Sequence, residues 1–372
     1  MARRVCLPRI LRRQRTVKAS AGDIKKQYSK FVKRKMLFLL LGIFLLLIIS
    51  LVAVCAGSAD LSFTDVLTAL AARFLPGVEA PQFNDAVLWN LRLPRIIMGV
   101  VAGIGLAISG TQMQGITRNP LVSPFTLGIS SAAALGASLI IMFGIGFAGT
   151  GTLLIIGNAF LFAMLSTLIV FGLSKLKGAS PETLILAGIA LSYFFGALTS
   201  IVQFFAPEQT LMAMVHWTFG TFTGVTWGEI GIVALVVALC VPIFLKYSWD
   251  LNAMVSIGDE TAKGLGVNTQ RVRSVSLVLS AFITATVISF TGIIGFVGLV
   301  APHITRYLVG GDHRFLLPGS CIIGAILMVG ADTIGRTIAS PIIFPISIVV
   351  SFLGVPLFLY IMLTRKQDYW RK

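Results

Sequence analysis

The chain has 372 residues, of which 56% are hydrophobic and only 12% are charged, and its formal net charge is +16 at pH 7. Soluble domains carry about 25% charged residues, so this composition excludes an ordinary water-soluble domain. The four cysteines and three histidines are widely separated, at spacings that match neither a disulfide framework nor a metal site. We therefore expect a membrane protein that binds no metal or cofactor of its own.

Uncharged runs mark the membrane crossings in chain order. A bilayer core about 30 Å thick needs roughly 20 apolar residues per helix, whereas barrel strands would alternate polar and apolar side chains. The sequence therefore predicts an all-α polytopic membrane protein with about ten transmembrane helices. The predicted crossings are residues 36–56, 96–116, 122–142, 152–174, 182–206, 229–247, 273–293, 295–308, 315–334 and 344–364. The eighth is short and contains Pro302, so we expect that it does not span fully.

Basic residues predict the orientation of the chain. The tail before the first crossing, residues 1–35, has 13 Lys and Arg side chains and one acid, Asp23. Over all segments, 26 Lys and Arg residues lie on the side of this tail and four on the other. Such residues accumulate in cytoplasmic loops. We expect cytoplasmic N- and C-terminal tails (1–35 and 366–372) on a plasma (inner) membrane protein whose transmembrane domain is 36–365.

The tail itself has two interpretations. A basic run can bind nucleic acid, or it can be attracted to anionic lipid headgroups. Because the tail adjoins a membrane crossing, we favour lipid and expect no nucleic-acid partner.

The second crossing has unusual flanks. Arg92 and Arg95 surround Pro94 at its predicted outer end, where the charge bias disfavours arginine. Glycines four residues apart then follow, at Gly99 and Gly103, and such spacing lets helix backbones approach closely. On the other side Pro120, within Arg118-Asn119-Pro120, predicts the end of the helix.

Several blocks together carry a family resemblance. The chain resembles the FecCD-type permeases, the membrane subunits of type II ABC importers for iron siderophores, haem and vitamin B12. The resemblance covers about residues 36–365. The matching blocks, in order, are RLPR and QGITRNPLVSP within 91–130, HWTFGTFTGVTW at 216–227, GDETAKGLGV at 258–267, TGIIGFVGLVAPHITR at 291–306, GDHR at 311–314, ADTIGR at 331–336 and GVPLF at 354–358.

The chain departs from the family pattern before its last helix. Phe344-Pro345-Ile346-Ser347 stands where many members have Glu-x-Pro-x-Gly. Thr221 stands where serine is usual, and the N-terminal tail is longer than the family needs. The first departure leaves open the details of substrate or binding-protein contacts.

The resemblance implies a docking role at the outer surface for three arginines. Arg92, Arg95 and Arg336 would meet acidic residues on the two lobes of an extracytoplasmic substrate-binding protein, because Arg pairs well with carboxylates. The alternative is that these side chains extend toward lipid headgroups. We expect exchange of both Arg92 and Arg95 for Glu to abolish transport and to leave folding intact.

ATP hydrolysis is expected in a partner subunit. No stretch reads G-x-x-x-x-G-K-[ST], so the chain has no phosphate-binding loop and is not expected to be an enzyme. The resemblance assigns contact with the ATPase to a coupling loop, about 248–272. Two short helices joined by a turn would form a compact projection, with acids in the first turn of the first helix and glycines in the turn between the helices. An ordinary capped loop is the alternative. The loop residues are Gly258, Asp259, Glu260, Ala262, Gly264, Leu265 and Gly266.

Residues 204–227 are too short to span the membrane. A short helix dipping back at the mouth of the pathway would suit this segment, and the resemblance places His216, Trp217 and Phe219 along the route. Aromatic packing without substrate contact is the alternative. Asp332, an acid near a late crossing, is either functional or paired with Arg336 four residues on, and we favour the pair.

The leading hypothesis is one permease subunit of a symmetric pair, with two ATPase subunits and an extracytoplasmic binding protein. The expected cargo is a ferric siderophore first, then haem or cobalamin. The main alternative is an ion-coupled secondary transporter, since Pro120 and Pro302 indicate broken helices. A membrane anchor or receptor without transport is a third.

Overall fold

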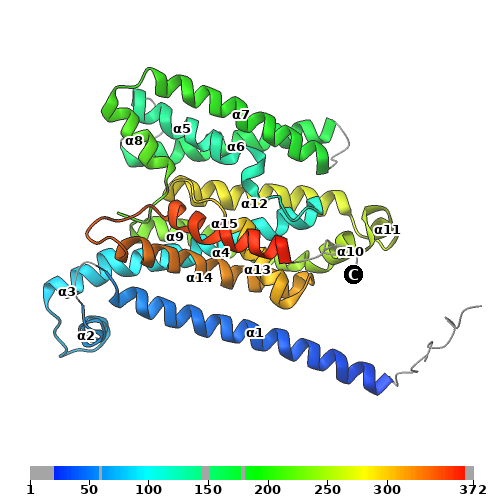
Figure 1. Cartoon of the computed structure of the whole chain (residues 1–372), viewed down its shortest axis with the longest axis horizontal. Coiled ribbons are helices and arrows are strands. Elements are labelled where there is room, and N and C mark those ends of the chain that lie inside the picture. The colour runs from blue at the N-terminus through cyan, green and yellow to red at the C-terminus, as the bar shows by residue number, and fades with distance from the viewer. Residues whose placement is uncertain (1–20, 58–60, 145–150, 177–180, 365–372) are drawn as a thin grey trace, which may run out of the picture.

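The computed structural model describes residues 21–57, 61–144, 151–176 and 181–364. Within these ranges every regular element is a helix, as the sequence predicts. Figure 1 shows the long helices running side by side as one bundle. The elements are α1 (Ala21–Cys55), α2 (Phe63–Phe74), α3 (Gln82–Val87), η1 (Leu88–Arg92), α4 (Leu93–Thr117), η2 (Pro124–Leu127), α5 (Ile129–Phe143), α6 (Thr152–Leu176), α7 (Pro181–Phe204), α8 (Glu208–Thr218), α9 (Trp227–Lys246), α10 (Ser248–Ile257), α11 (Asp259–Gly264), α12 (Thr269–Thr291), α13 (Val297–Val309), α14 (His313–Thr337) and α15 (Ile346–Thr364).

Each of the ten predicted crossings coincides with a helix. Seven helices in the described ranges are long and apolar enough to cross a bilayer, and α5 and α15 are shorter apolar helices. The predicted eighth crossing is α13, with 13 residues, which confirms that it is too short to span. The predicted start of the third crossing at residue 122 is wrong, because Pro120 and Pro124 delay the helix and η2 precedes α5.

The predicted boundary at residue 36 is also not a helix boundary. Helix α1 begins at Ala21 and continues without a break through the basic residues into the apolar run. The remaining predicted tails, 1–20 and 366–372, lie outside the described residues.

Helix α4 occupies the centre of the bundle and packs against α9, α12, α13 and α14. Its small residues meet small residues on neighbouring helices. A Cβ on Gly103 would lie 2.5 Å from the carbonyl oxygen of Gly324 in α14, and a Cβ on Gly110 would collide with Gly298 in α13. The glycine spacing therefore does allow the close backbone approach that the sequence predicts.

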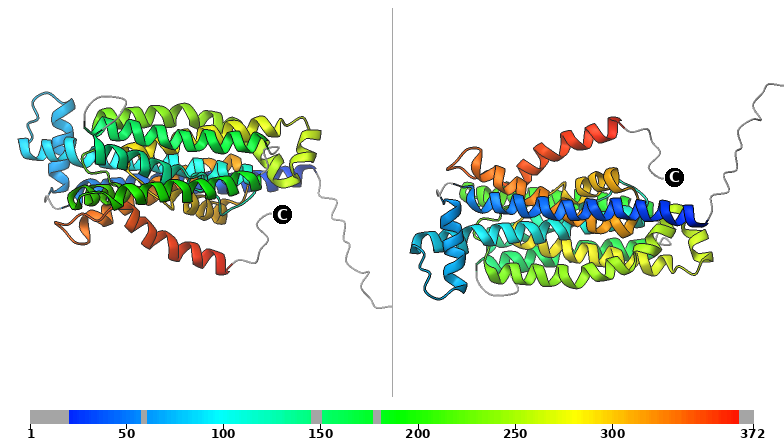
Figure 2. Two further views of the ribbon diagram at one scale, coloured as in Figure 1. Left: turned by 90° about the horizontal axis from the view of Figure 1, so that it is seen from above. Right: turned by 90° about the horizontal axis from the view of Figure 1, so that it is seen from below.

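The bundle has two distinct ends (Figure 1). We call the end with α2, α3 and α8 the α8 end, and the end with α10 and α11 the α10 end. Both described chain ends, the start of α1 and the finish of α15, lie at the α10 end. Figure 2 shows that α15 leans away from the rest of the bundle along most of its length. Large apolar side chains of α15 are exposed, such as Phe352 at 77% and Leu363 at 80%, so this helix has surface available for lipid or for a second copy.

Candidate functional site

At the α10 end, two short helices form a projection beyond the bundle (Figure 1). Gly258 joins them with φ +83°, a conformation that favours glycine, so α10 ends and α11 begins at Asp259. The predicted position of Asp259 and Glu260 in a first helical turn is confirmed. The predicted second short helix after Gly264 and Gly266 is wrong, because that turn leads into the long helix α12. We call α10 and α11 together the helix pair.

Buried contacts attach the helix pair to the bundle. The side chain of Ala262 is fully buried. Arg273 of α12 donates from Nη2 to Asp259 Oδ2 at 2.6 Å and from Nε to the carbonyl of Ile116, near the end of α4, at 3.2 Å. One guanidinium thus links α11 to two central helices of the bundle.

A second connection runs from α10 to α14. Asn252 donates from Nδ2 to Asp312 Oδ1 at 2.8 Å, and its own oxygen accepts from the backbone N–H of His313 at 2.8 Å. Asp312 is the N-cap of α14 and pairs with Arg314 at 2.6 Å. Burial alone would raise the pKa of Asp312, but hydrogen bonds from Arg314 and Asn252 lower it to about 2. The carboxylate therefore stays charged, and the link stays intact, at every physiological pH.

The outward face of the helix pair is exposed. Glu260 and Lys263 form an ion pair of 2.8 Å whose side chains are 88% and 53% exposed. Beside them, the apolar side chain of Leu265 is 71% exposed. The outward face therefore combines an exposed ion pair with one apolar side chain, on helices that polar contacts attach to the bundle.

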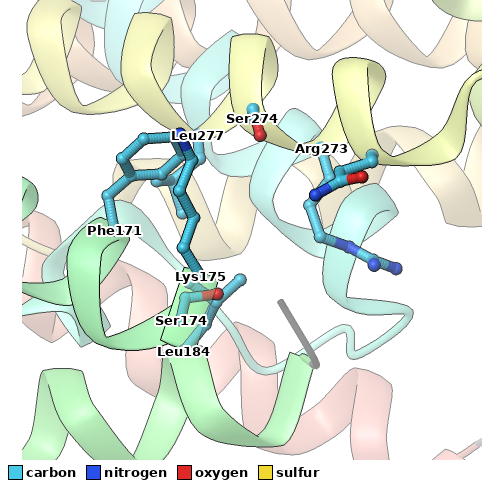
Figure 3. Close-up of a pocket in the computed structure, with 8 residues that line it drawn as sticks. Phe171, Ser174, Lys175, Leu184, Arg273, Ser274 and Leu277 are labelled. Atoms are coloured by element: carbon cyan, nitrogen blue, oxygen red, sulfur yellow. The ribbon is translucent and has the colours of Figure 1, made fainter. Parts of the chain in front are cut away.

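A small cavity lies nearby, between α6, α7 and α12. Figure 3 shows Phe171, Lys175 and Leu277 at this cavity, while the guanidinium of Arg273 points away from Phe171 and Lys175. The cavity volume is about 10 Å³, too small for a substrate. We therefore assign it no binding role.

At the α8 end, the three sequence-predicted arginines come together. They contribute to a cavity of about 340 Å³, along with Phe83 and Phe222. Arg92 donates from Nη1 to the carbonyls of Val54 and Cys55, the latter at 2.9 Å. Arg336 donates to the carbonyls of Ala53 and Ala56, the latter at 2.7 Å. Both arginines thereby satisfy carbonyls at the end of α1 that have no partner within the helix.

Arg95 and Arg336 share one acid. Arg95 Nη2 lies 2.6 Å from Asp332 Oδ1, and Arg336 Nε lies 3.4 Å from Asp332 Oδ2. The predicted pairing of Asp332 with Arg336 is confirmed. The structure also shows a shorter contact between Asp332 and Arg95, which the sequence did not predict. Arg95 also donates to the hydroxyl of Thr223 at 3.1 Å.

All three arginines are largely shielded from solvent. Arg92 is 4% exposed and Arg336 7%, whereas the Arg95 side chain is 11% exposed. The burial of Arg92 argues against the expectation that the exchange of both Arg92 and Arg95 for Glu leaves folding intact, since a carboxylate at position 92 would face the carbonyls of α1. Three guanidinium groups with one carboxylate still leave this cavity with a net positive charge.

The segment after α7 contains the expected short helix, α8, with 11 residues. His216 and Phe219 are exposed and Trp217 is half-buried. The backbone after α8 is held in place by α12 and α15: Thr221 N–H donates to Thr291 at 2.7 Å and Ile346 N–H donates to Gly220 at 3.2 Å.

The atypical segment before α15 has a clear place in this arrangement. The Ser347 hydroxyl donates to the carbonyl of Phe219, and Phe344 N–H donates to the carbonyl of Gly335 at 2.8 Å. The residues that replace the family's Glu-x-Pro-x-Gly stretch thus connect α15 to α14 and to the segment after α8.

Comparisons with known proteins find a family model and relatives that match most of this chain. The model of the FecCD transport family matches residues 45–364. An ABC transporter permease of Methanocaldococcus jannaschii is 44% identical over 349 residues, which cover 92% of this chain and 98% of the relative. The hemin transport system permease protein of Yersinia pestis is 36% identical, over 89% of this chain and 97% of the relative.

A solved structure has the same fold. It is described as an inward-facing conformation of a metal-chelate type ABC transporter, and it matches with a TM-score of 0.75 and 31% identity. The match covers 89% of this chain and all of that chain.

Proposed function

This chain belongs to the FecCD transport family and is an ABC transporter permease, and we propose that two copies of it form the pathway of an importer for a ferric chelate. Two ATPase subunits bind the helix pairs of the two copies, and an extracytoplasmic binding protein delivers the cargo. The α10 end then faces the cytoplasm of a plasma-membrane protein and the α8 end faces outward, in agreement with the excess of basic residues toward the α10 end.

The attachment of the helix pair supports the coupling step. A partner that moves α11 also moves Asp259, and through Arg273 it moves the adjoining ends of α12 and α4. A partner that moves α10 acts through Asn252 on the first turn of α14. Force applied outside the membrane therefore reaches three central helices through short polar contacts rather than through a flexible loop.

Recognition of the binding protein falls mainly to Arg95. Arg92 and Arg336 are buried and engaged with α1, so they supply positive potential more than direct contact. The guanidinium of Arg95 lies at the cavity and donates hydrogen bonds to two side chains, Asp332 and Thr223. A carboxylate of the binding protein can compete for this guanidinium, because Arg pairs with carboxylates bidentately.

The cargo class rests on similarity. One relative is named for hemin transport, and the solved structure is described as a metal-chelate type ABC transporter. A ferric siderophore is the first candidate cargo, and haem and cobalamin follow. The carbonyl of Phe219 accepts a hydrogen bond from Ser347 of α15, the leaning helix, and we propose that His216, Trp217 and Phe219 lie along the pathway. Uptake competition among a ferric siderophore, hemin and cobalamin orders these candidates.

The alternative of an ion-coupled carrier has less support. Such carriers need ionisable groups that are free to change charge within the membrane. Among the described residues of the late crossings, the buried acid is Asp332, and two arginines hold it.

Co-purification tests the coupling role. Gly264 has open space around the position of a Cβ, so Gly264→Trp obstructs a partner without straining the chain. Leu265→Asp removes the exposed apolar contact. We expect both variants to lose the ATPase subunit during purification. The control Gly228→Trp at the α8 end, where a Cβ would lie 4.0 Å from the Thr226 hydroxyl oxygen, should retain it. Retention of the ATPase by both loop variants would reject the helix pair as the contact.

A further inference from the structure

The first turns of α1 carry a basic face at the α10 end. Gln27, Lys30, Phe31, Arg34 and Lys35 are spaced so that all five lie on one side of the helix. Lys30 and Arg34 are exposed, and they stand four residues apart. Like charges at this spacing destabilise a helix, so the face is poorly compensated from within α1.

These five residues line a cavity of about 600 Å³. The opposite wall is the end of α13, residues Leu308, Val309 and Gly310. The lining therefore has three cationic side chains and no acid. The volume falls within the range of about 300 to 1,000 Å³ that is typical of sites for small molecules.

Lys35 is the most informative member of this lining. It is 6% exposed, and its ammonium lies 3.9 Å from the ring centre of Phe31 and 4.9 Å from that of Phe315. The nearby carboxylate of Asp312 is already engaged by Arg314 at 2.6 Å and by Asn252 at 2.8 Å. Within the described part of the chain, no carboxylate lies within 4.0 Å of Lys30, Arg34 or Lys35.

The surroundings of the cavity are apolar on the side toward the membrane. Phe31 is 49% exposed and Leu308 52%. Further along α1, Leu37 and Leu41 are 56% and 57% exposed. A ligand that fits has an anionic head for the three cations and an apolar tail for the exposed residues.

We propose that this cavity binds the phosphate headgroup of an anionic phospholipid, with Lys30, Arg34 and Lys35 as its cationic ligands and the acyl chains along α1. Basic pockets between transmembrane helices on the cytoplasmic side suit such headgroups. The bound lipid neutralises the repulsion along α1 and fixes the start of this helix against α13. The site depends on the membrane position of this end of the bundle and not on the cargo or on the ATPase.

Lipid binding to the purified full-length chain tests the site. Native mass spectrometry in detergent compares phosphatidylglycerol with phosphatidylcholine for the wild type, for Lys30→Gln plus Arg34→Gln, and for the matched pair Lys26→Gln plus Lys33→Gln. All four side chains are exposed on α1, and the matched pair lies outside the cavity lining. Each basic residue near an anionic surface is worth about 1 kcal/mol, so the lining pair should weaken phosphatidylglycerol binding by roughly tenfold or more.

Three results would overturn the proposal. The first is equal weakening by the lining pair and the matched pair, since that indicates a diffuse charge effect. The second is a wild type that does not prefer phosphatidylglycerol to phosphatidylcholine. The third is displacement of phosphatidylglycerol by inorganic phosphate at equal concentration, which indicates a site for a free anion. Since none of these outcomes involves uptake or the ATPase, the lipid site and the transport function fail independently.

Discussion

The two ends of the bundle use their charged side chains in opposite ways. At the α8 end, Arg92 and Arg336 are buried and bind the carbonyls of α1, and Asp332 lies between Arg95 and Arg336. At the α10 end, the ion pair of Glu260 and Lys263 is exposed, and buried contacts such as that of Arg273 support it from behind. The charged side chains of the α8 end therefore mainly stabilise the fold, whereas at the α10 end Glu260 and Lys263 form an exposed charged surface, which we propose as part of the contact with the ATPase.

Removal of Asp332 should have the largest effect on stability. Asp332→Ala leaves Arg95 and Arg336 near each other in a buried place without their acid, and breaking a buried pair costs about 3–5 kcal/mol. Thermal unfolding of the purified protein in detergent measures this loss. Asp85→Ala is the control, because its pair with Arg73 is 3.9 Å long and partly exposed, and it should cost less than about 1 kcal/mol. Equal melting temperatures of the two variants would contradict the assignment of a structural role.

The next largest effect is expected at Arg92. Arg92→Met keeps much of the side-chain volume but removes the donors to the Val54 and Cys55 carbonyls. Hydrogen bonds to charged groups contribute about 1.5–3 kcal/mol each, so the loss should be about 3 kcal/mol. The same thermal measurement on Arg73→Met, whose side chain is 58% exposed, should show almost no change. A stable Arg92→Met protein that fails only in binding-protein capture would instead restore a direct docking role.

Arg273 should show a smaller loss of stability together with a loss of coupling. Arg273→Met breaks the contacts with Asp259 and with the Ile116 carbonyl, at about 2 kcal/mol. The ATPase should still co-purify, because the outward face of the helix pair is unchanged, but ATP-driven uptake should fall at least about tenfold. Normal uptake by this variant would show that force reaches the bundle by another route.

The smallest effect on stability is expected at the exposed pair. Glu260→Gln should change the free energy of unfolding by less than about 1 kcal/mol, although the pair of Glu260 and Lys263 is as short as a buried one at 2.8 Å. The free energy of binding to the ATPase subunit, measured by surface plasmon resonance, should change by more than the free energy of unfolding. A large drop in melting temperature would indicate that the outward face of the helix pair packs against the bundle.

Local features explain what the sequence predicted well. Uncharged runs locate the helices because each crossing must be apolar along its own length. The pair of Asp332 and Arg336 is four residues apart, so helical periodicity alone predicts it. Likewise, the spacing of Gly99 and Gly103 in α4 predicts close packing, and Gly103 does lie against the backbone of Gly324.

Features that depend on distant segments could not be predicted. Arg95 and Asp332 are 237 residues apart, and Asn252 and Asp312 are 60 apart. No periodicity relates such positions. The sequence could have indicated Asp312 as the N-cap of a helix, because an acid there is a preferred capping residue. No sequence pattern identifies Asn252 as its partner. The helix after the turn at Gly264 and Gly266 was also not predicted correctly, since residue type alone does not tell whether the chain after a turn forms a second short helix or the start of the long helix α12.

The most direct measurement of the central claim is uptake into proteoliposomes. The proteoliposomes carry the chain in their membrane with its ATPase subunit facing the lumen. The binding protein, loaded with a radiolabelled ferric siderophore, is added to the external buffer. We predict uptake that requires ATP, that is lost with Gly264→Trp, and that is retained with Gly228→Trp. Accumulation by the chain alone, driven by an ion gradient without ATP, would contradict the assignment of this protein as the permease of an ABC importer.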